Sequence, residues 1–365
     1  MRVGLVIYGS LDSMSGGYLY DRKLLEHLET EGDQVEVFSI PWRSYPRHLL
    51  DNLSSQWLNQ LVRADLDLLL QDELNHPSLF WINRRLRPRT PYPIISIVHH
   101  LRSCECWAPP LSPLYRVVER RYLKSVDALV FNSQSTRLSV IDLLGCAGSG
   151  VIAYPGGDRL DPAMDEGAIL ARANRSGPLR LAFVGNLIPR KGLHGLLAAL
   201  ADLKHESWEL WVIGCTRRDS AYTKRIRGII ANAGLGGRVQ LLGSVSDAEL
   251  ARLLRSSDAI AMPFSYEGFG IVYLEGMAYG LPALASNTGG AREIVAHGES
   301  GYLIDPGDLR RVTRLVRHLM VDRGELSRMS LAARRRFEAF PTWEQTTTKI
   351  RNFLLEMVQS VGRDS

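Results

Sequence analysis

Short apolar runs rich in Val, Ile and Leu alternate with longer amphipathic runs through the first half of the chain. The amphipathic runs over residues 17–31 and 114–124 have the spacing of helices that bury one face. The apolar runs predict six strands, Arg2–Ile7, Gln34–Phe38, Leu66–Leu70, Pro93–Val98, Ala128–Phe131 and Val151–Ala153. Near-continuous apolar strands separated by helices are typical of a parallel sheet that is covered on both faces.

The same alternation begins again after residues 159–178, a stretch with Pro, Gly and charges that we interpret as an interdomain linker. Five more strands are predicted, Leu179–Val184, Glu209–Ile213, Val239–Leu241, Ala259–Met262 and Ala283–Ala285. Helices are predicted over 193–203, 221–233, 247–255 and 270–279, and again from Leu309 onward. The pattern therefore predicts an α/β protein with two tandem doubly wound, Rossmann-like domains, 1–158 and 179–340. Since ligands bind at the carboxyl ends of strands in such sheets, we expect the active site in a cleft that both domains face.

The composition is that of an ordinary globular protein. The chain has 365 residues, of which 45% are hydrophobic and 23% charged, which excludes a disordered chain. The net charge of +5 is too small to indicate a nucleic-acid-binding protein, and residues 1–158 hold 16 Lys and Arg against 17 Asp and Glu. Four scattered cysteines argue against a disulfide-rich secreted fold. With no signal-like segment and no apolar run of 18 residues, we expect a cytoplasmic protein.

Two stretches of the second domain carry candidate chemistry. Lys191 lies in a loop between a strand and a helix, where free N–H groups and the helix dipole attract an anion. Glu267 and Glu275 flank a Gly-Phe-Gly turn that opens a helix, and we expect their carboxylates roughly 10 Å apart. That separation is wide for a hydrolase pair, so the carboxylates suit hydroxyl groups on separate parts of one long ligand. Hydroxyls, a diphosphate and a hydroxylated ring together describe a sugar nucleotide.

These stretches resemble the retaining family 4 glycosyltransferases of GT-B fold, whose E-x7-E motif matches Glu267 and Glu275. The resemblance extends over nearly the whole chain and depends on the order and spacing of many short motifs. They are Ser15-Gly-Gly17, Asn132-Ser133, Tyr154–Asp158, Gly185–Gly192, Gly214, Gly243, Ser257-Asp258, Gly280-Leu-Pro282, Gly289-Gly290 and Gly298–Gly301.

The resemblance implies a role for each matching residue. Lys191 would bind the donor diphosphate, Glu275 the ribose hydroxyls and Glu267 the sugar hydroxyls, while His99 would touch the transferred sugar. The remaining donor-binding positions that it implies are Gly17, Asn186, Arg190, Gly214, Val245, Gly268, Phe269, Gly270 and Ile271. Asn186 departs from the family pattern, which often has Arg there, so either Arg190 supplies the second cation or the leaving group is held less strongly. Residues 341–365 would form a helix that returns toward the first domain, anchored by Trp343.

The family mechanism implied is same-face attack on a nucleotide-diphosphate hexose, UDP- or GDP-linked, in which the leaving phosphate helps to deprotonate the acceptor hydroxyl. Catalysis would involve His99, Glu267 and Lys191, and no cofactor and no metal are expected. Two alternatives remain open. One is a GT-B nucleotide-sugar epimerase or phosphorylase, and the other is a nucleotide-sugar-binding protein without catalysis, to which Asn186 gives the only support.

Two features of the first domain allow a second interpretation. His99, His100, Cys104 and Cys106 include zinc-ligand residue types, although their spacing is narrower than in structural zinc sites. The basic segment Arg84–Arg89, next to Trp81, is either a solvated helix end or a local contact with anionic lipid. The acceptor therefore stays open between a lipid and a saccharide, with weak association to a membrane surface as one option and no nucleic-acid partner expected.

Overall fold

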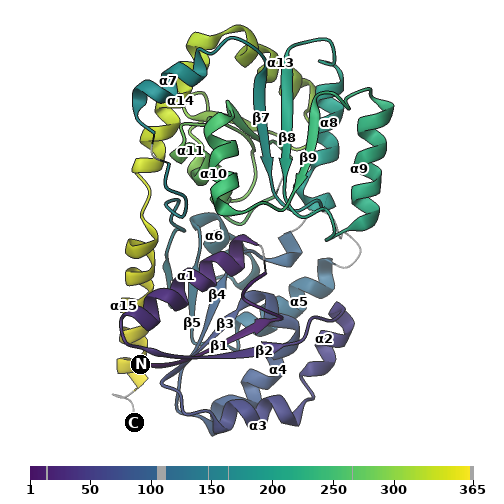
Figure 1. The fold of residues 1–365 in the computed structure, drawn as a ribbon. Helices are drawn as coiled ribbons and strands as arrows, with labels where there is room; N and C mark the ends of the chain where they lie inside the picture. Colours follow the sequence, from purple (N-terminus) through teal and green to yellow (C-terminus); the bar gives the residue numbers. More distant parts are fainter. Residues whose placement is uncertain (14, 105–111, 147, 163, 265, 362–365) are drawn as a thin grey trace. The chain divides into compact units, whose positions relative to one another are not determined.

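The computed structural model describes residues 1–13, 15–104, 112–146, 148–162, 164–264 and 266–361, which form two compact units (Figure 1). Unit 1 comprises Met1–Pro155 and Thr342–Ser365, and unit 2 comprises Gly156–Pro341. Each unit contains one six-stranded sheet in which every pair of neighbouring strands is parallel. The predicted α/β class with two doubly wound domains is confirmed.

The sheet of unit 1 has the strand order β2-β1-β3-β4-β5-β6. Its strands are β1 (Arg2–Tyr8), β2 (Gln34–Ile40), β3 (Leu68–Asp72), β4 (Ile94–Val98), β5 (Ala128–Phe131) and β6 (Gly150–Ile152). All residues of β3, β4 and β5 are buried, as the continuous apolar runs predict for central strands covered on both faces. The chain order reverses between β1 and β3, which makes the carboxyl ends of these strands the expected ligand edge.

Helices cover both faces of this sheet. They are α1 (Gly16–Thr30), α2 (Tyr45–Asp51), α3 (Ser55–Arg63), α4 (His76–Leu86), α5 (Ser112–Leu123), α6 (Gln134–Leu144) and α15 (Trp343–Val361), with 3-10 turns η1 (Glu73–Asn75), η2 (Arg87–Arg89) and η3 (Arg102–Cys104). Leu58, Leu79, Tyr122 and Val140, from α3, α4, α5 and α6, belong to one core cluster with residues such as Val6 from the sheet. Because side chains alternate along a strand, the neighbours of these sheet residues point to the opposite face.

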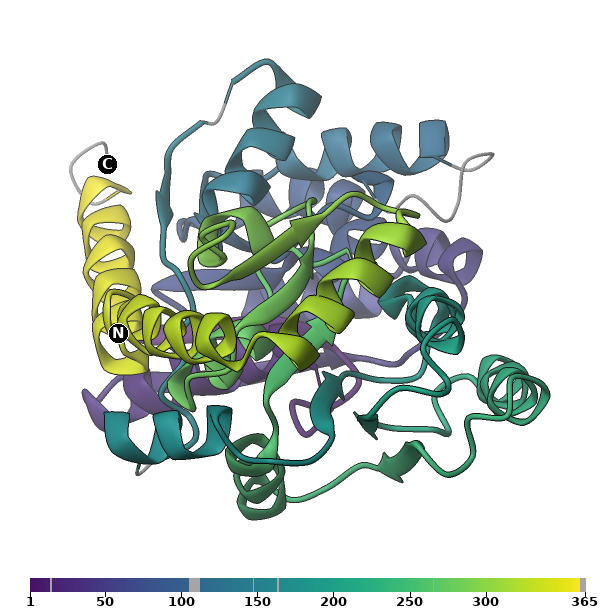
Figure 2. The same ribbon diagram turned by 90° about the horizontal axis from the view of Figure 1, so that it is seen from above.

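Helix α15 belongs to unit 1 although unit 2 separates it from the rest of that unit in the sequence. It packs beside α1, and the ring of Trp343 meets that of Tyr20 edge-on at 5.8 Å. Asp33 accepts hydrogen bonds from the terminal amine of Met1 at 2.6 Å and from Arg351 Nε at 2.7 Å. The N-terminus and α15 are therefore held together, and both lie side by side in Figures 1 and 2.

The sheet of unit 2 has the strand order β12-β11-β10-β7-β8-β9. Its strands are β7 (Leu179–Val184), β8 (Trp208–Ile213), β9 (Val239–Gly243), β10 (Ala259–Met262), β11 (Ala283–Ser286) and β12 (Gly301–Ile304). The edge strand β12 was not among the strands predicted from the sequence. The chain order reverses between β7 and β10, so the carboxyl ends of these two strands form the topological switch point of this sheet.

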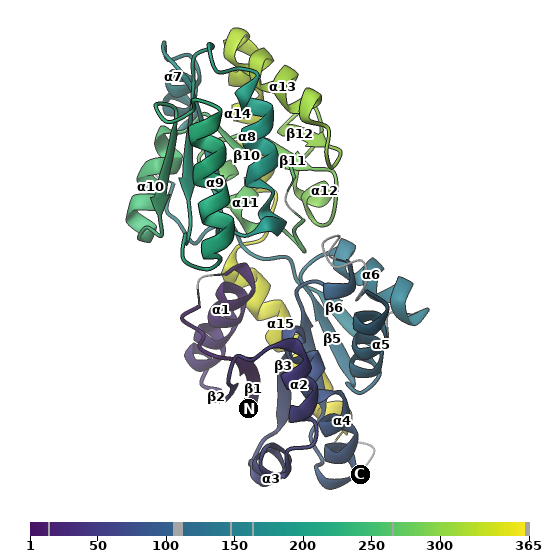
Figure 3. The same ribbon diagram turned by 90° about the vertical axis from the view of Figure 1, so that its right-hand side faces the viewer.

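The helices of unit 2 lie in two layers, with α8, α9 and α13 on one face and α7, α10, α11 and α14 on the other (Figure 3). Their bounds are α7 (Glu166–Ala173), α8 (Leu193–Ala201), α9 (Ser220–Asn232), α10 (Asp247–Ser256), α11 (Ile271–Ala278), α12 (Ala291–Ile294), α13 (Leu309–Val321) and α14 (Arg323–Glu338), with the 3-10 turn η4 (Pro189–Lys191). Among the helices of the described residues, none is both long and apolar enough to cross a membrane.

Residues 159–178, for which we expected a linker, instead contain α7 and belong to unit 2. Asp165 caps this helix by accepting a hydrogen bond from the amide of Ala168. Ile169 is fully buried, and Arg172 donates hydrogen bonds to the carbonyl oxygens of Tyr279 and Gly280 at 2.5 and 2.7 Å. The prediction was wrong because the helix is amphipathic over only two turns, and the Pro, Gly and charges around it are typical of a linker.

Candidate functional site

The two predicted ligands of the donor phosphate and sugar lie at the switch point of unit 2. Lys191 ends the short turn η4, which follows β7, and Glu267 lies in the loop that follows β10. Lys191 Nζ donates a hydrogen bond to Glu267 Oε1, and Arg190 Nη1 lies 3.9 Å from Glu267 Oε2. Lys191 and Glu267 are 76 residues apart in the sequence. They meet because β7 and β10, which precede them, are neighbours in the sheet.

Glycine residues shape the loop that carries Glu267. Gly270 directly precedes the first residue of α11 and has a φ of +101°, a backbone conformation that residues with a side chain rarely adopt. Gly289 has a φ of +61°, and a Cβ there would lie 2.1 Å from the carbonyl oxygen of Glu267. The amide of Gly290 donates to that same oxygen at 3.1 Å. The backbone of Gly289-Gly290 therefore packs directly against the loop of Glu267, and at Gly289 only glycine allows so close an approach.

Glu275 lies inside α11 and is 4% exposed. Arg159 Nε donates to Glu275 Oε1 at 2.7 Å, and Arg159 Nη1 forms a second ion pair with Asp247, the first residue of α10. Burial lowers the pKa of Arg159, but the carboxylates of Glu275 and Asp247 more than offset that and raise it. Sequence reasoning missed Arg159, although it directly follows the motif Tyr154–Asp158.

The other predicted donor-binding positions of unit 2 lie on the same edge of the sheet or in the loop before α11. Asn186 follows β7 and its Oδ1 accepts a hydrogen bond from the amide of Cys215 at 3.3 Å, while Gly214 follows β8 and Val245 follows β9. Gly268 and Phe269 lie between Glu267 and Gly270, and Ile271 is the first residue of α11. Arg190 Nη1 donates to the carbonyl oxygen of Tyr266 at 2.6 Å, which ties η4 to the loop of Glu267.

In unit 1 the structure brings Gly17 and His99 together. Gly17 is the second residue of α1, His99 follows β4, and a Cβ on Gly17 would lie 3.1 Å from Cδ2 of the imidazole. His99 is buried and its Nε2 lies 3.2 Å from Asp21 Oδ1, whereas His100 is half-buried. Asp21 is a fully buried residue of α1 that sequence reasoning missed. Its signal was present, because Asp21 follows Gly17 by one helical turn and so shares its face of the helix.

Two groups of described residues place acidic and imidazole side chains within 4.8 Å of one another, Asp21 with Asp72 and His99, and Glu73 with His76 and Glu119. In each group the imidazole is already hydrogen-bonded inside the protein, to Asp21 in the first and to Tyr45 and the backbone of Glu73 in the second. Cys106 of the alternative metal site considered above lies outside the described residues. The imidazole of His99 faces a carboxylate, which is not the arrangement that a Cys-rich zinc site needs.

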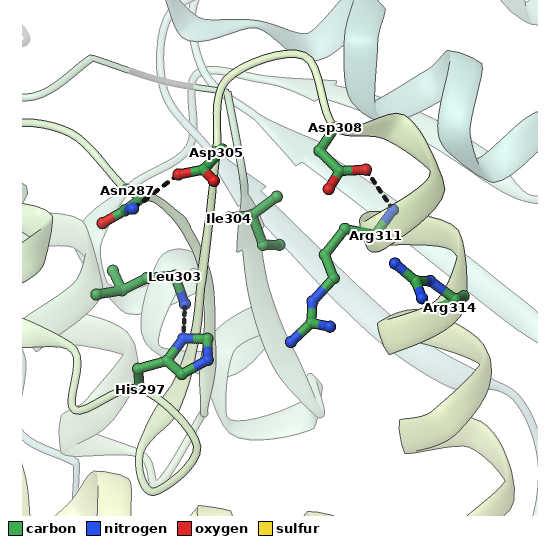
Figure 4. Close-up of a pocket in the computed structure, with 8 residues that line it drawn as sticks. All are labelled: Asn287, His297, Leu303, Ile304, Asp305, Asp308, Arg311 and Arg314. Carbon is green, nitrogen blue, oxygen red and sulfur yellow. Dashed lines mark hydrogen bonds between the residues drawn. The ribbon is translucent and has the colours of Figure 1, made fainter.

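A hollow of about 440 Å³ lies at the carboxyl ends of β11 and β12 (Figure 4). Asn287 Nδ2 donates to Asp305 Oδ1 at 2.7 Å, and Asp308 Oδ1 accepts from the amide of Arg311 at 2.9 Å. Its acidic side chains are thus engaged within the hollow, and none of the predicted site residues lines it.

Comparison with protein families identifies both units. The model of glycosyl transferases group 1 matches residues 170–336, and the model of Glycosyltransferase Family 4 matches residues 19–158. A GDP-mannose-dependent alpha-(1-6)-phosphatidylinositol monomannoside mannosyltransferase of Mycobacterium tuberculosis is 31% identical over 66% of this chain and 65% of its own length. The match therefore spans slightly less than two thirds of that relative. A D-inositol 3-phosphate glycosyltransferase of Thermobispora bispora is 27% identical over 95% of this chain and 91% of its own.

Solved structures agree with this assignment at the level of the fold. Sucrose-phosphate synthase from Thermosynechococcus elongatus superposes with a TM-score of 0.83 at 21% identity, covering 98% of this chain and 99% of its own. Anabaena HepE in complex with UDP and glucose superposes with a TM-score of 0.76 at 20% identity, covering 97% and 99%. Both family models together span most of the chain, which therefore belongs to the glycosyltransferases of group 1 and family 4 and has the GT-B fold.

Proposed function

We propose that this protein is a retaining glycosyltransferase that moves a hexose from a UDP- or GDP-linked sugar to an acceptor hydroxyl. The observation that carries the proposal is the contact of Lys191 with Glu267 at the switch point of unit 2. A cation beside a carboxylate, next to the amino end of α11, offers a diphosphate and a hydroxylated sugar their complementary partners. The named relatives, which include a GDP-mannose-dependent enzyme, and HepE with its bound UDP support a nucleotide-sugar donor.

The residues of unit 2 divide the donor among them in this proposal. Lys191, helped by Arg190 and by the amides of Gly268, Phe269 and Gly270, stabilises the charge that develops on the leaving diphosphate. Glu267 accepts hydrogen bonds from sugar hydroxyls once the ligand has separated it from Lys191. Glu275, which is paired with Arg159, accepts them from the ribose. Because cations and N–H groups fulfil the role of a Lewis acid, no metal is required.

In the proposed chemistry the acceptor oxygen attacks the anomeric carbon from the face that the diphosphate leaves. The bond from that carbon to the phosphate oxygen breaks, and the leaving phosphate receives the proton of the acceptor hydroxyl. His99 contacts the transferred sugar and Gly17 approaches the diphosphate. Neither Glu267 nor Glu275 has to transfer a proton.

The acceptor is a lipid or a saccharide, and a feature of unit 1 favours weak contact with an anionic membrane surface. Leu50, Leu53 and Trp81 are 64%, 71% and 46% exposed, and the guanidinium of Arg84 lies 5.4 Å from the centre of the Trp81 ring. Exposed apolar side chains beside arginines suit anionic headgroups. Sedimentation with vesicles that contain phosphatidylglycerol tests this contact, which Trp81→Ala should weaken. Equal binding by both proteins would contradict it.

A thermal-shift panel of nucleoside diphosphates and their sugars tests the donor. A ligand at 100 times its Kd stabilises the folded state by about 2.7 kcal/mol, so the correct base and sugar should raise the Tm most. Hydrolysis of the best donor then distinguishes an enzyme from a binding protein without catalysis. The proposal fails if no nucleotide sugar shifts the Tm at millimolar concentration, and an epimerase is indicated if the recovered donor carries an altered sugar.

A further inference from the structure

A histidine and two aspartates form a buried ionisable cluster at the ligand edge of unit 1. Asp21 comes from α1, Asp72 ends β3 and His99 follows β4, and their side chains lie within 4.8 Å of one another. Both aspartates are fully buried and the side chain of His99 is 8% exposed. A buried charge is costly unless another charge compensates it, so this cluster constrains the protonation of its members.

The imidazole of His99 is fixed on several sides. Nε2 and Asp21 Oδ1 form a hydrogen bond of 3.2 Å, and the ring of Tyr20 meets the imidazole edge-on at 5.4 Å between ring centres. The side-chain Nδ2 of Asn132 donates to the backbone carbonyl oxygen of His99 at 2.8 Å, which holds the backbone of His99 in place. Within the described ranges, Nδ1 of His99 makes no hydrogen bond. One ring nitrogen is thus committed to Asp21, and the other remains for a ligand.

The charges around the ring favour its protonated form. Burial alone lowers the pKa of His99, but the carboxylates of Asp21, Asp72 and Glu73 outweigh burial and raise it to about 9. Burial and the charge of Asp21 raise the pKa of Asp72 well above its usual range. Among these carboxylates Asp21 raises the pKa of His99 most, and it is the one that forms a hydrogen bond with the ring.

We propose that Asp21 is a positioning residue that keeps His99 protonated, with Nδ1–H as a charged hydrogen-bond donor to the oxygen atoms of the donor sugar or its phosphate. The inference rests on the proposed glycosyl transfer and deepens it, because it assigns His99 electrostatic stabilisation and not the role of a base. A protonated imidazole cannot accept the proton of the acceptor hydroxyl. The attraction between a cation at this position and the leaving group would strengthen as negative charge develops on that group.

The ring can be observed directly, without any substrate. We expect NMR of protein labelled with ¹³C- and ¹⁵N-histidine, assigned with a His99→Gln variant, to show both ring nitrogens protonated at pH 7.5 and titration of His99 near pH 9. Asp21→Asn keeps a hydrogen-bond acceptor and removes the charge, so the pKa of His99 should fall by roughly one to two units. Asp72→Asn should lower it less, and Asp65→Asn on the surface should leave it unchanged.

Titration of His99 at or below pH 6.5 in the unaltered protein would overturn the inference, whether or not Asp21→Asn folds. An equal pKa in the unaltered protein and in a folded Asp21→Asn variant would do the same. So would a change of the His99 signals on addition of Zn²⁺ or on removal of metal by EDTA, since a metal would then replace the proton. These readouts do not depend on activity, so they separate this inference from the proposed function.

Activity supplies a second readout. If the donor panel identifies a substrate, kcat/KM of the unaltered protein should fall as pH rises through about 9, when His99 loses its proton. In Asp21→Asn the fall should move toward neutrality by the same interval that NMR measures. A folded Asp21→Asn variant with an unchanged pH profile would show that Asp21 is structural only. NMR titration as expected in a protein that transfers no sugar would contradict the glycosyltransferase proposal alone.

Discussion

At the scale of single residues, the charged side chains of the candidate site in unit 2 form ion pairs. Lys191 is paired with Glu267, and Glu275 is paired with Arg159. Each glutamate was recognisable in the sequence by its place around a Gly-Phe-Gly turn, and Lys191 by its place between a strand and a helix. Arg159 and Asp21 were missed, because their partners lie 116 and 78 residues away in the sequence and the only local signal was their position close after a motif residue.

If the proposed function is correct, Lys191→Ala should reduce kcat/KM for transfer by at least about 100-fold, since it removes the cation proposed to stabilise the leaving diphosphate. The ion pair that it breaks is largely buried, but Arg190 stays within 3.9 Å of Glu267 and partly compensates its charge, so the Tm should fall by only a few degrees. Steady-state kinetics and thermal denaturation measure both effects. Lys204→Ala, an exposed lysine of the same unit, is the matched control and should alter neither. A Lys191→Ala variant with the rate of the unaltered protein would refute the diphosphate assignment.

Glu119 in α5 gives a prediction about stability and pH. Burial, and next the charge of Glu73, raise the pKa of Glu119 from 4.5 to about 7. The folded state therefore keeps a proton that the unfolded state releases, so this residue's contribution to stability is full below pH 4.5 and is lost as pH rises through 7. The shift corresponds to about 3 kcal/mol at most.

Glu119→Gln should remove that loss, because the amide stays neutral and its oxygen can still accept the hydrogen bond from the amide of Ser103. Urea unfolding at pH 5.5 and pH 8 should show a smaller fall in stability for the variant than for the unaltered protein. Glu36→Gln, on the exposed surface, is the control and should leave the pH dependence as it was. The same pH dependence in Glu119→Gln would mean that Glu119 is already ionised at pH 5.5.

At the scale of elements, the sequence predicted the central strands well and the short peripheral elements poorly. Central parallel strands are apolar on both faces, so Leu179–Val184 was predicted with the bounds that the structure has. The short helix α7 and the edge strand β12 carry too few apolar residues for a periodic signal. The candidate site does not follow this division, since Lys191 and Glu267 after central strands were singled out whereas Asp72, which ends the central strand β3, and Asp21 in α1 were not.

The loop of Glu267 depends on its glycine support, which Gly289→Ala tests. The new Cβ would lie 2.1 Å from the carbonyl oxygen of Glu267 and would occupy a left-handed conformation with a φ of +61°. The backbone strain alone costs roughly 1–3 kcal/mol, and relief of the clash has to displace Glu267. Unfolding by urea should show at least that loss, together with a weaker thermal shift by the donor. Gly236→Ala meets no atom within 4 Å and should be nearly neutral. Equal stability of both variants would contradict this account of the loop.

At the scale of the whole molecule, unit 2 is one continuous segment whereas unit 1 is closed by a helix from the far end of the chain. Helix α15 buries Trp343, Ile350 and Leu354 in unit 1, and each such side chain stabilises the folded state by about 1.5–3 kcal/mol. A chain that ends at residue 341 should therefore lose roughly 5 kcal/mol or more of the stability of unit 1 and keep that of unit 2.

In calorimetry the unfolding transition of unit 1 in this shortened chain should move to much lower temperature. The other transition, identified by its shift with the nucleoside diphosphate, should stay in place. If the shortened chain aggregates, Ile350→Ala can be measured instead. It should lower the free energy of unfolding of unit 1 alone by about 2–5 kcal/mol. Loss of the nucleotide-dependent transition on shortening, or an unchanged transition of unit 1 in both variants, would show that the two units do not divide the stability of the chain in this way.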